Sequence, residues 1–143
     1  CPVLGVAIAS GPLWRASLAT VHIPNTCTGL EWLMSGPREL ERTRRCAHAV
    51  GEALGRFHAC GGQHADLHAG NVLLREGDGD ARAWIIDLDK ARCNVFPVAP
   101  RHNELKRLAR SLEKRGLLDS IDHSTREIFI EAYNAALKTD PNL

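Results

Sequence analysis

The sequence predicts an α+β chain in which a short strand-rich beginning is followed by a mainly α-helical part that contains one β-hairpin. Three observations lead to this class. Apolar and β-branched residues cluster before residue 24, an apolar stripe with helical spacing runs from residue 38 to residue 60, and two later apolar runs enclose the turn EGDGDA. With 143 residues, of which 44% are hydrophobic, the chain can bury one ordinary core.

Two strands are predicted at the start of the chain. Residues 3–9 and 16–23 are rich in apolar and β-branched side chains, and the triplet SGP between them is a combination that ends strands. We therefore expect a β-hairpin or two neighbouring strands. The polar segment HIPNTCTG at 22–29 predicts a connector, and LEWLM at 30–34 predicts a short helix that a second SGP triplet breaks.

A long amphipathic helix is predicted from residue 38 to residue 60. Its apolar residues have spacings of three, four and seven: Leu40, Ala47, Val50, Leu54 and Phe57. The pair Gly61-Gly62 should end this helix, because glycine commonly follows a last helical turn. After a polar loop, residues 72–75 and 82–87 predict two strands joined by the turn EGDGDA, which together form a β-hairpin.

Two more helices are predicted after this hairpin. Residues 102–115 carry three leucines on one face, and Gly116 should end the helix. Ser124 and Glu127 have the spacing of a capping box, which predicts a last helix that starts there and reaches about Lys138.

Composition excludes several classes of function. A net charge of +1 lacks the basic excess expected of a nucleic-acid binder. The five cysteines are odd in number and contain no CxxC pair, which argues against a disulfide framework or a zinc ribbon and favours a reducing, cytoplasmic setting. No apolar run approaches the ~20 residues that cross a bilayer, so we expect a soluble or peripheral protein.

The sequence HADLHAGN reads as His64-x-Asp66-x4-Asn71, and Asp87 follows sixteen residues after Asn71. A hairpin whose first strand starts at Asn71 and whose second strand ends at Asp87 brings these two side chains to the same end of the ribbon. Amide and carboxylate oxygens are ligands that suit Mg²⁺. Asp66 should lie close to the metal and is suited to orient an attacking hydroxyl or accept its proton.

The order and spacing of these residues are those of the catalytic-loop signature of the protein-kinase-like fold, H-x-D-x-x-x-x-N followed by a strand and an aspartate. The predicted fold is therefore the mainly α-helical C-terminal lobe of that fold with its hairpin, plus remnant strands of the N-terminal lobe. Position 65 is alanine where regulated protein kinases have arginine, and the segment after Asp87 is too short for an activation segment. A small molecule, sugar or lipid headgroup is thus the expected acceptor.

Four stretches resemble the bacterial 3-deoxy-D-manno-octulosonic acid (Kdo) kinases of the lipopolysaccharide kinase family, over nearly the full chain. The stretches are GPLWRASLATVHIPNTCTGLEWL, HADLHAGNVLL, IIDLDKAR and NELKRLARSLEK. The resemblance implies an enzyme that uses ATP and Mg²⁺ to phosphorylate a Kdo hydroxyl of the lipid A-linked inner core. It also implies a peripheral position at the cytoplasmic face of the bacterial inner membrane.

The same resemblance implies roles for individual residues. Asp66 is the expected catalytic aspartate, and Asn71 and Asp87 are the expected metal ligands. The backbone of Val21, His22 and Ile23 is the expected hinge that contacts adenine. Residues 1–28 would then be remnant N-lobe strands and hinge, and residues 29–143 the kinase-like C-lobe.

One feature departs from the family pattern. Kinase-like enzymes grip the ATP phosphates with a glycine-rich strand pair and a lysine, but this chain has no G-x-G-x-x-G and no lysine before Lys90. Since the chain begins at Cys1, we expect that an upstream stretch of the natural protein is missing and that residues 1–143 are inactive alone. Two rival functions stay open: an aminoglycoside-, choline- or homoserine-type phosphotransferase, and a non-catalytic pseudokinase-like binding module.

Several other polar residues have more than one reading. Four of them match no zinc pattern: His58, Cys60, His64 and His68. His64 is expected to pack under the loop and bond its backbone, whereas His68 contacts either the acceptor or solvent. Asp89 is either a second metal ligand or a partner of an arginine such as Arg92.

Two sets of side chains are expected to have structural roles. Arg38, Arg42 and Arg45 share one face of the predicted long helix, which is a solvated face by default and a contact for lipid phosphates as the alternative. The three tryptophans, Trp14, Trp32 and Trp84, are expected to pack in the core or the hinge, because no basic stripe accompanies them.

Overall fold

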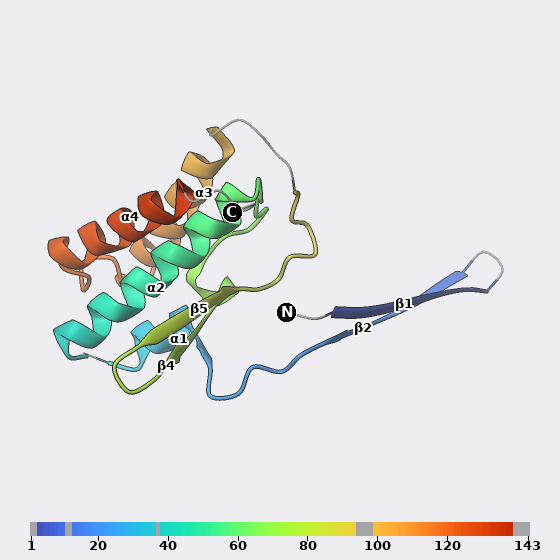
Figure 1. Cartoon of the computed structure of the whole chain (residues 1–143), viewed down its shortest axis with the longest axis horizontal. Coiled ribbons are helices and arrows are strands. Elements are labelled where there is room, and N and C mark those ends of the chain that lie inside the picture. Colours follow the sequence, from blue (N-terminus) through green and yellow to red (C-terminus); the bar gives the residue numbers. More distant parts are fainter. Residues whose placement is uncertain (1–2, 11–12, 37, 94–98, 139–143) are drawn as a thin grey trace.

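A computed structural model describes residues 3–10, 13–36, 38–93 and 99–138. Within these residues the fold is α+β, as predicted, with two small antiparallel sheets and four α-helices (Figure 1). The elements are, in order, β1 (Val3–Ser10), β2 (Leu13–Thr20), β3 (Cys27–Thr28), α1 (Gly29–Met34), α2 (Leu40–Ala59), the 3₁₀ turn η1 (Ala69–Asn71), β4 (Val72–Glu76), β5 (Ala81–Ile85), α3 (Ala99–Glu113) and α4 (His123–Leu137).

The first two strands form the expected hairpin, which projects away from the helices in Figure 1. β1 pairs with β2 from Val3↔Thr20 to Ser10↔Leu13. The second strand therefore spans Leu13–Thr20 rather than the predicted 16–23, because the paired length of β1 sets the length of its partner. Residues 21–23, which the sequence placed in this strand, have no regular structure.

The second sheet has the order β3-β4-β5, and it packs on α2. The predicted hairpin after the polar loop is present, with Val72 opposite Ile85. The second strand ends at Ile85 and not at Asp87 as predicted, because Asp87 has a φ of +61° that turns the chain out of the sheet. The two-residue strand β3 was not predicted, since two residues are too few to form a pattern.

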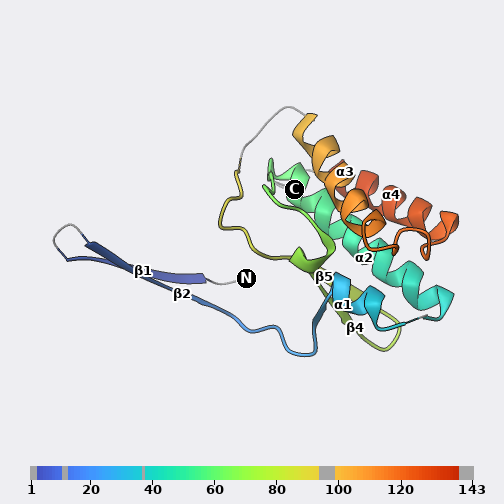
Figure 2. The ribbon, with the colours of Figure 1, turned by 180° about the vertical axis from the view of Figure 1, so that it is seen from behind.

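The long helix α2 packs along α4, and the two lie side by side in Figures 1 and 2. Their contact depends on two glycines. A Cβ atom at Gly51 would lie 2.3 Å from the Phe129 carbonyl oxygen, and one at Gly55 would lie 2.5 Å from the Tyr133 carbonyl oxygen. These positions therefore let the two backbones approach more closely than side chains would permit.

We expect Gly55→Ala to destabilise the protein, although alanine favours helix by up to ~1 kcal/mol. The added Cβ would also lie 2.7 Å from the Ala136 Cβ, so α2 and α4 must separate, and such overpacking typically costs about 1–3 kcal/mol. Urea denaturation measures the free energy of unfolding. His48→Ala, at an exposed position of the same helix, is the control and should not destabilise. A Gly55→Ala protein at least as stable as wild type would contradict this packing.

The start of α4 differs from the prediction. Asp122, not Ser124, is the N-cap, and its carboxylate accepts from the Thr125 backbone N–H at 3.1 Å. Ser124 instead donates its hydroxyl to Asp122, and the predicted partner Glu127 lies 3.3 Å from His123. The sequence contains both cap patterns two residues apart, and aspartate and serine are about equally favourable N-cap residues, so the pattern alone does not choose between them.

We expect Asp122→Ala to lower the urea midpoint at pH 7. Hydrogen bonds from Ser124 and Thr125 hold the pKa of Asp122 well below the ordinary aspartate value of 3.8. The carboxylate therefore stabilises the fold above the unfolded-state pKa, and this contribution is lost as the pH falls below about 4. The difference between wild type and variant should shrink in acid. Glu127→Ala should leave the urea midpoint unchanged. If Glu127→Ala lowered the midpoint as much as Asp122→Ala does, the predicted capping box of Ser124 and Glu127 would be favoured instead.

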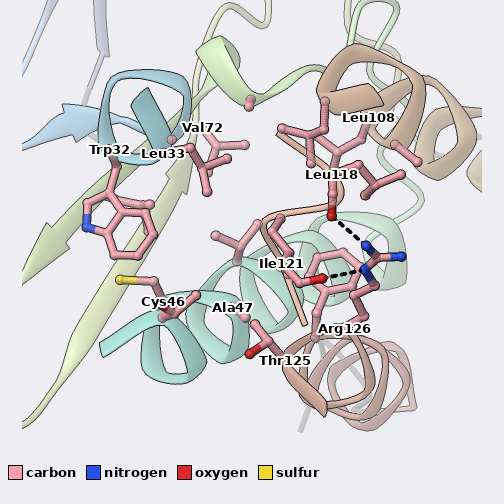
Figure 3. A pocket seen from close by; sticks show the side chains of 18 of the residues that line it. Trp32, Leu33, Cys46, Ala47, Val72, Leu108, Leu118, Ile121, Thr125 and Arg126 are labelled. Carbon is pink, nitrogen blue, oxygen red and sulfur yellow. Dashed lines mark hydrogen bonds between the residues drawn. The ribbon is translucent and has the colours of Figure 1, made fainter. Parts of the chain in front are cut away.

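The core contains an apolar cavity of about 290 Å³ between α1, α2, α3 and α4. Figure 3 shows Trp32 and Cys46 on one side of it and Leu108 and Leu118 on the other. Burial raises the pKa of Cys46 to about 12, so this thiol stays protonated at neutral pH. The side chains that line the cavity are mainly apolar and include no carboxylate. No helix of the described residues is both long and apolar enough to cross a membrane.

Candidate active site

The polar loop with the sequence HADLHAGN, residues 64–71, is called the HADLHAGN loop below. It starts three residues after Gly61, whose φ of +73° ends α2 as predicted. Gln63, just before the loop, exchanges two backbone hydrogen bonds with Arg92, at 2.8 and 2.9 Å. The loop is thus joined at its base to the segment that follows Asp87.

The structure brings together the three polar residues that the spacing predicted. The Asn71 side-chain nitrogen donates to the Asp66 carbonyl oxygen at 3.0 Å and lies 3.4 Å from Asp87 Oδ2. Asn71 is buried, whereas the Asp66 side chain is 71% exposed and Asp87 is also exposed. One buried amide therefore joins the backbone of Asp66 to the side chain of Asp87, and the carboxylates of both aspartates are open to a ligand.

His64 holds the loop in this arrangement. The ring is buried, its Nδ1 accepts from the Asp66 backbone N–H at 3.1 Å, and its Nε2 donates to the Ile86 carbonyl oxygen at 3.0 Å. The acceptor role of Nδ1 fixes the tautomer, because the donor hydrogen must then be on Nε2. His64 thus packs under the loop as expected, and it connects Asp66 to the residue before Asp87.

His68 lies beside Asp66 at the surface. Its Nδ1 accepts from the Gly70 backbone N–H at 3.1 Å and caps η1, while its Nε2 lies 3.7 Å from Asp66 Oδ2. Neither the 3₁₀ turn nor this cap was predicted. Histidine is not a usual cap residue, so no pattern of residue types indicated it.

The predicted hinge residues Val21, His22 and Ile23 lie between β2 and β3. Val21 is 54% exposed, and the Ile23 carbonyl oxygen accepts from the Thr26 hydroxyl at 3.0 Å. In the part of the chain that the structure describes, no hydrogen bond joins these residues to Asp66, Asn71 or Asp87. Their predicted contact with adenine stays a prediction.

Two other sets of polar residues can be compared with the structure. Within the described ranges, no three His, Cys, Asp or Glu side chains form a group that could hold a metal ion. Asp89 is exposed, and no ion pair joins it to Arg92 among the residues described.

The predicted arginine face is wrong in part, because Arg38 precedes α2 and stacks over Trp32 at 5.3 Å. Arg42 is not free for lipid phosphates, since it forms a two-bond ion pair with Glu76 at 2.8 and 2.9 Å. Trp32 packs in the core as expected, and the half-buried Trp84 lies under Arg75.

The donor atoms of this cluster fit a magnesium ion. Asn71 uses its side-chain nitrogen on protein groups, and its side-chain oxygen accepts no hydrogen bond from any residue the structure describes. That oxygen and the exposed Asp87 carboxylate are hard oxygen donors on adjacent side chains. Mg²⁺ is commonly bound in this way, through one or two protein oxygens together with water and substrate phosphates.

Comparisons with known proteins identify the family that this chain matches. The family model described as lipopolysaccharide kinase (Kdo/WaaP) matches residues 2–133. A 3-deoxy-D-manno-octulosonic acid kinase of Vibrio parahaemolyticus serotype O3:K6 (strain RIMD 2210633) is 30% identical over 129 residues, which are 90% of this chain and 51% of that protein. The enzyme of the same name from Stenotrophomonas maltophilia (strain K279a) is 44% identical over 65 residues, 46% of this chain and 25% of that protein.

A solved structure described as WaaP in complex with acyl carrier protein has a similar fold. Its TM-score is 0.68 at 21% identity, and the match covers 92% of this chain and 56% of that one. The chain thus spans about half the length of the Vibrio parahaemolyticus relative and of this structure.

Proposed function

Since the chain belongs to the lipopolysaccharide kinase (Kdo/WaaP) family, which implies ATP as phosphoryl donor, we propose that the protein containing it is a Kdo kinase. The acceptor is a Kdo hydroxyl of the lipid A-linked inner core. The observation that carries this proposal is the cluster in which buried Asn71 bonds the Asp66 backbone and lies 3.4 Å from Asp87. Kinase chemistry needs these groups together, because it works by positioning and charge stabilisation.

Asp66 orients the acceptor hydroxyl and takes its proton as the sugar oxygen bonds to the γ-phosphorus and ADP leaves. Its exposed carboxylate next to half-buried His68 supports this role. Asn71 and Asp87 would hold Mg²⁺, which neutralises charge on the ATP phosphates. His64 keeps the backbone of Asp66 and the chain before Asp87 in a fixed relation.

The finer fold assignment is part of the same proposal. Residues 29–143 form a kinase-like C-lobe, and residues 1–28 supply N-lobe strands and a hinge whose backbone at Val21, His22 and Ile23 contacts adenine. Kinase-like enzymes grip the ATP phosphates with a glycine-rich strand pair and a lysine, and residues 1–89 of this chain contain no lysine and no G-x-G-x-x-G. A lipid-linked acceptor requires the protein to reach the cytoplasmic face of the inner membrane as a peripheral protein.

The test is phosphoryl transfer by the whole natural protein that contains this chain. Purified protein is incubated with labelled ATP, Mg²⁺ and, separately, a Kdo-bearing lipid A precursor, an aminoglycoside, choline and homoserine. We expect label on the Kdo-bearing lipid alone. Label on one of the other acceptors would replace the substrate assignment, whereas absence of transfer and of Mg·ATP binding would favour a non-catalytic binding module.

A further inference from the structure

Helix α3 binds the backbone of the HADLHAGN loop from the inside of the molecule. Glu104 is 2% exposed, and its Oε2 accepts from the His64 backbone N–H at 2.7 Å. One helical turn later, Arg107 donates to the carbonyl oxygens of Ala65 and of His64, the latter at 3.4 Å. Both backbone polar groups of His64 are therefore bound by side chains of α3, which runs beside η1 in Figure 2.

Glu104 is itself held by two other helices. Its Oε2 lies 3.3 Å from Nε2 of His58, a fully buried residue near the end of α2. Nδ1 of His58 lies 2.9 Å from the Tyr133 hydroxyl on α4. A carboxylate only accepts hydrogen bonds, so His58 donates through Nε2, and in the neutral ring Nδ1 then accepts from the Tyr133 hydroxyl. Burial raises the pKa of Tyr133, which keeps this phenol protonated and able to donate.

The contact between Glu104 and His64 leads to the backbone of Asp66. The Asp66 side chain is 71% exposed, and its Oδ2 lies 3.7 Å from Nε2 of His68, so few side-chain contacts fix it. Its backbone is fixed instead: the Asp66 N–H bonds the His64 ring, and His64 bonds Glu104. A path of two hydrogen bonds thus leads from Glu104 through His64 to the backbone of Asp66.

We propose that Glu104 is a positioning residue that sets the place of Asp66 through the backbone of His64. The proposal rests on the proposed function, in which Asp66 must meet an acceptor hydroxyl. A displacement of about 1 Å at a reacting group can cost roughly 100-fold in rate. The sequence gives no signal for Glu104, because it lies 38 residues after Asp66 and only the fold brings the two segments together.

The experiment compares three variants of the whole natural protein. Glu104→Ala removes the acceptor for the His64 N–H, Glu104→Gln restores an acceptor oxygen, and Tyr133→Phe is the matched control. Tyr133→Phe removes a bond of the same buried network without touching the loop. Each variant is measured for thermal stability, for kcat and KM with ATP, and for hydrogen exchange of the amides of residues 61–70.

For Glu104→Ala we expect a loss of about 100-fold in kcat with the KM for ATP within about twofold of wild type, and faster exchange in residues 61–70. Glu104→Gln should recover kcat to within about tenfold of wild type, because its amide oxygen accepts from the His64 N–H. Tyr133→Phe should keep kcat within about twofold and leave the exchange of this segment unchanged, even where it lowers the melting temperature as much as Glu104→Ala does.

Two results would overturn the proposal. One is a Glu104→Ala protein with wild-type kcat, and the other is a Tyr133→Phe protein of equal stability loss that loses kcat to the same extent. The hydrogen-exchange measurement distinguishes failure of the positioning role of Glu104 from failure of the proposed kinase function. If the wild-type protein phosphorylates no Kdo-bearing lipid, the function fails, whereas unchanged exchange in Glu104→Ala would refute the loop contact itself.

Discussion

Asp66→Asn should abolish phosphoryl transfer by the whole natural protein while ATP binding is kept. The amide has the size of the carboxylate but cannot accept the hydroxyl proton, and loss of such a group typically costs about 10²–10⁴-fold in rate. The fold should be unaffected, because the Asp66 side chain is exposed and the loop is held through its backbone. Transfer to the Kdo-bearing lipid and ATP affinity by calorimetry measure the two parts of this prediction.

The control for Asp66→Asn is Asp78→Asn, an exposed aspartate in the turn between β4 and β5. It makes the same chemical change and the same change in net charge away from the loop, so it should keep full activity. Wild-type transfer by Asp66→Asn would refute the catalytic role of Asp66. A parallel loss of ATP binding would instead show that this residue acts on the nucleotide.

Asp87→Ala should weaken binding of Mg·ATP rather than the reactivity of a bound complex. Loss of a residue that merely supports a metal ligand costs about 10–100-fold in affinity, and loss of a ligand itself should cost at least as much. Titration of the protein with ATP, in the presence of Mg²⁺ and after chelation, measures the effect. The variant should bind ATP equally with and without metal, whereas wild type should bind more tightly with it.

Asp119→Ala is the control for this second variant. Asp119 is exposed and lies before α4, away from the HADLHAGN loop in sequence, so its removal should leave the metal dependence of ATP binding unchanged. If Asp87→Ala retained the wild-type gain in affinity from Mg²⁺, Asp87 would not be a metal ligand. The short distance between the side chains of Asn71 and Asp87 would then need another explanation.

Local signals predicted the parts of the fold that short patterns determine. The apolar stripe of α2 and the glycine after it gave that helix within two residues, because one buried face and one terminator set both features. The hairpin after the HADLHAGN loop followed from two apolar runs around a turn. That hairpin is why the approach of Asn71 to Asp87 was predictable from their spacing.

Features that depend on distant segments were not predictable. Strand β5 stops at Ile85 because Asp87 takes a left-handed backbone conformation, and no periodicity in the sequence indicates that conformation. Arg42 pairs with Glu76 across 34 positions, so its placement on a free helix face was wrong. Glu104 belongs to the same class, since its partner His64 is 40 positions away and the helix pattern marks Glu104 as an ordinary polar residue.

In the proposed function, Asn71 and Asp87 hold the divalent metal of ATP beside Asp66. A crystal structure of the whole natural protein with Mn²⁺ and a non-hydrolysable ATP analogue, in which anomalous scattering locates the metal, would show whether they do. We expect a peak about 2.1 Å from the Asn71 side-chain oxygen and from an Asp87 carboxylate oxygen, with the terminal phosphate facing Asp66. A metal peak bound by neither side chain would contradict the account.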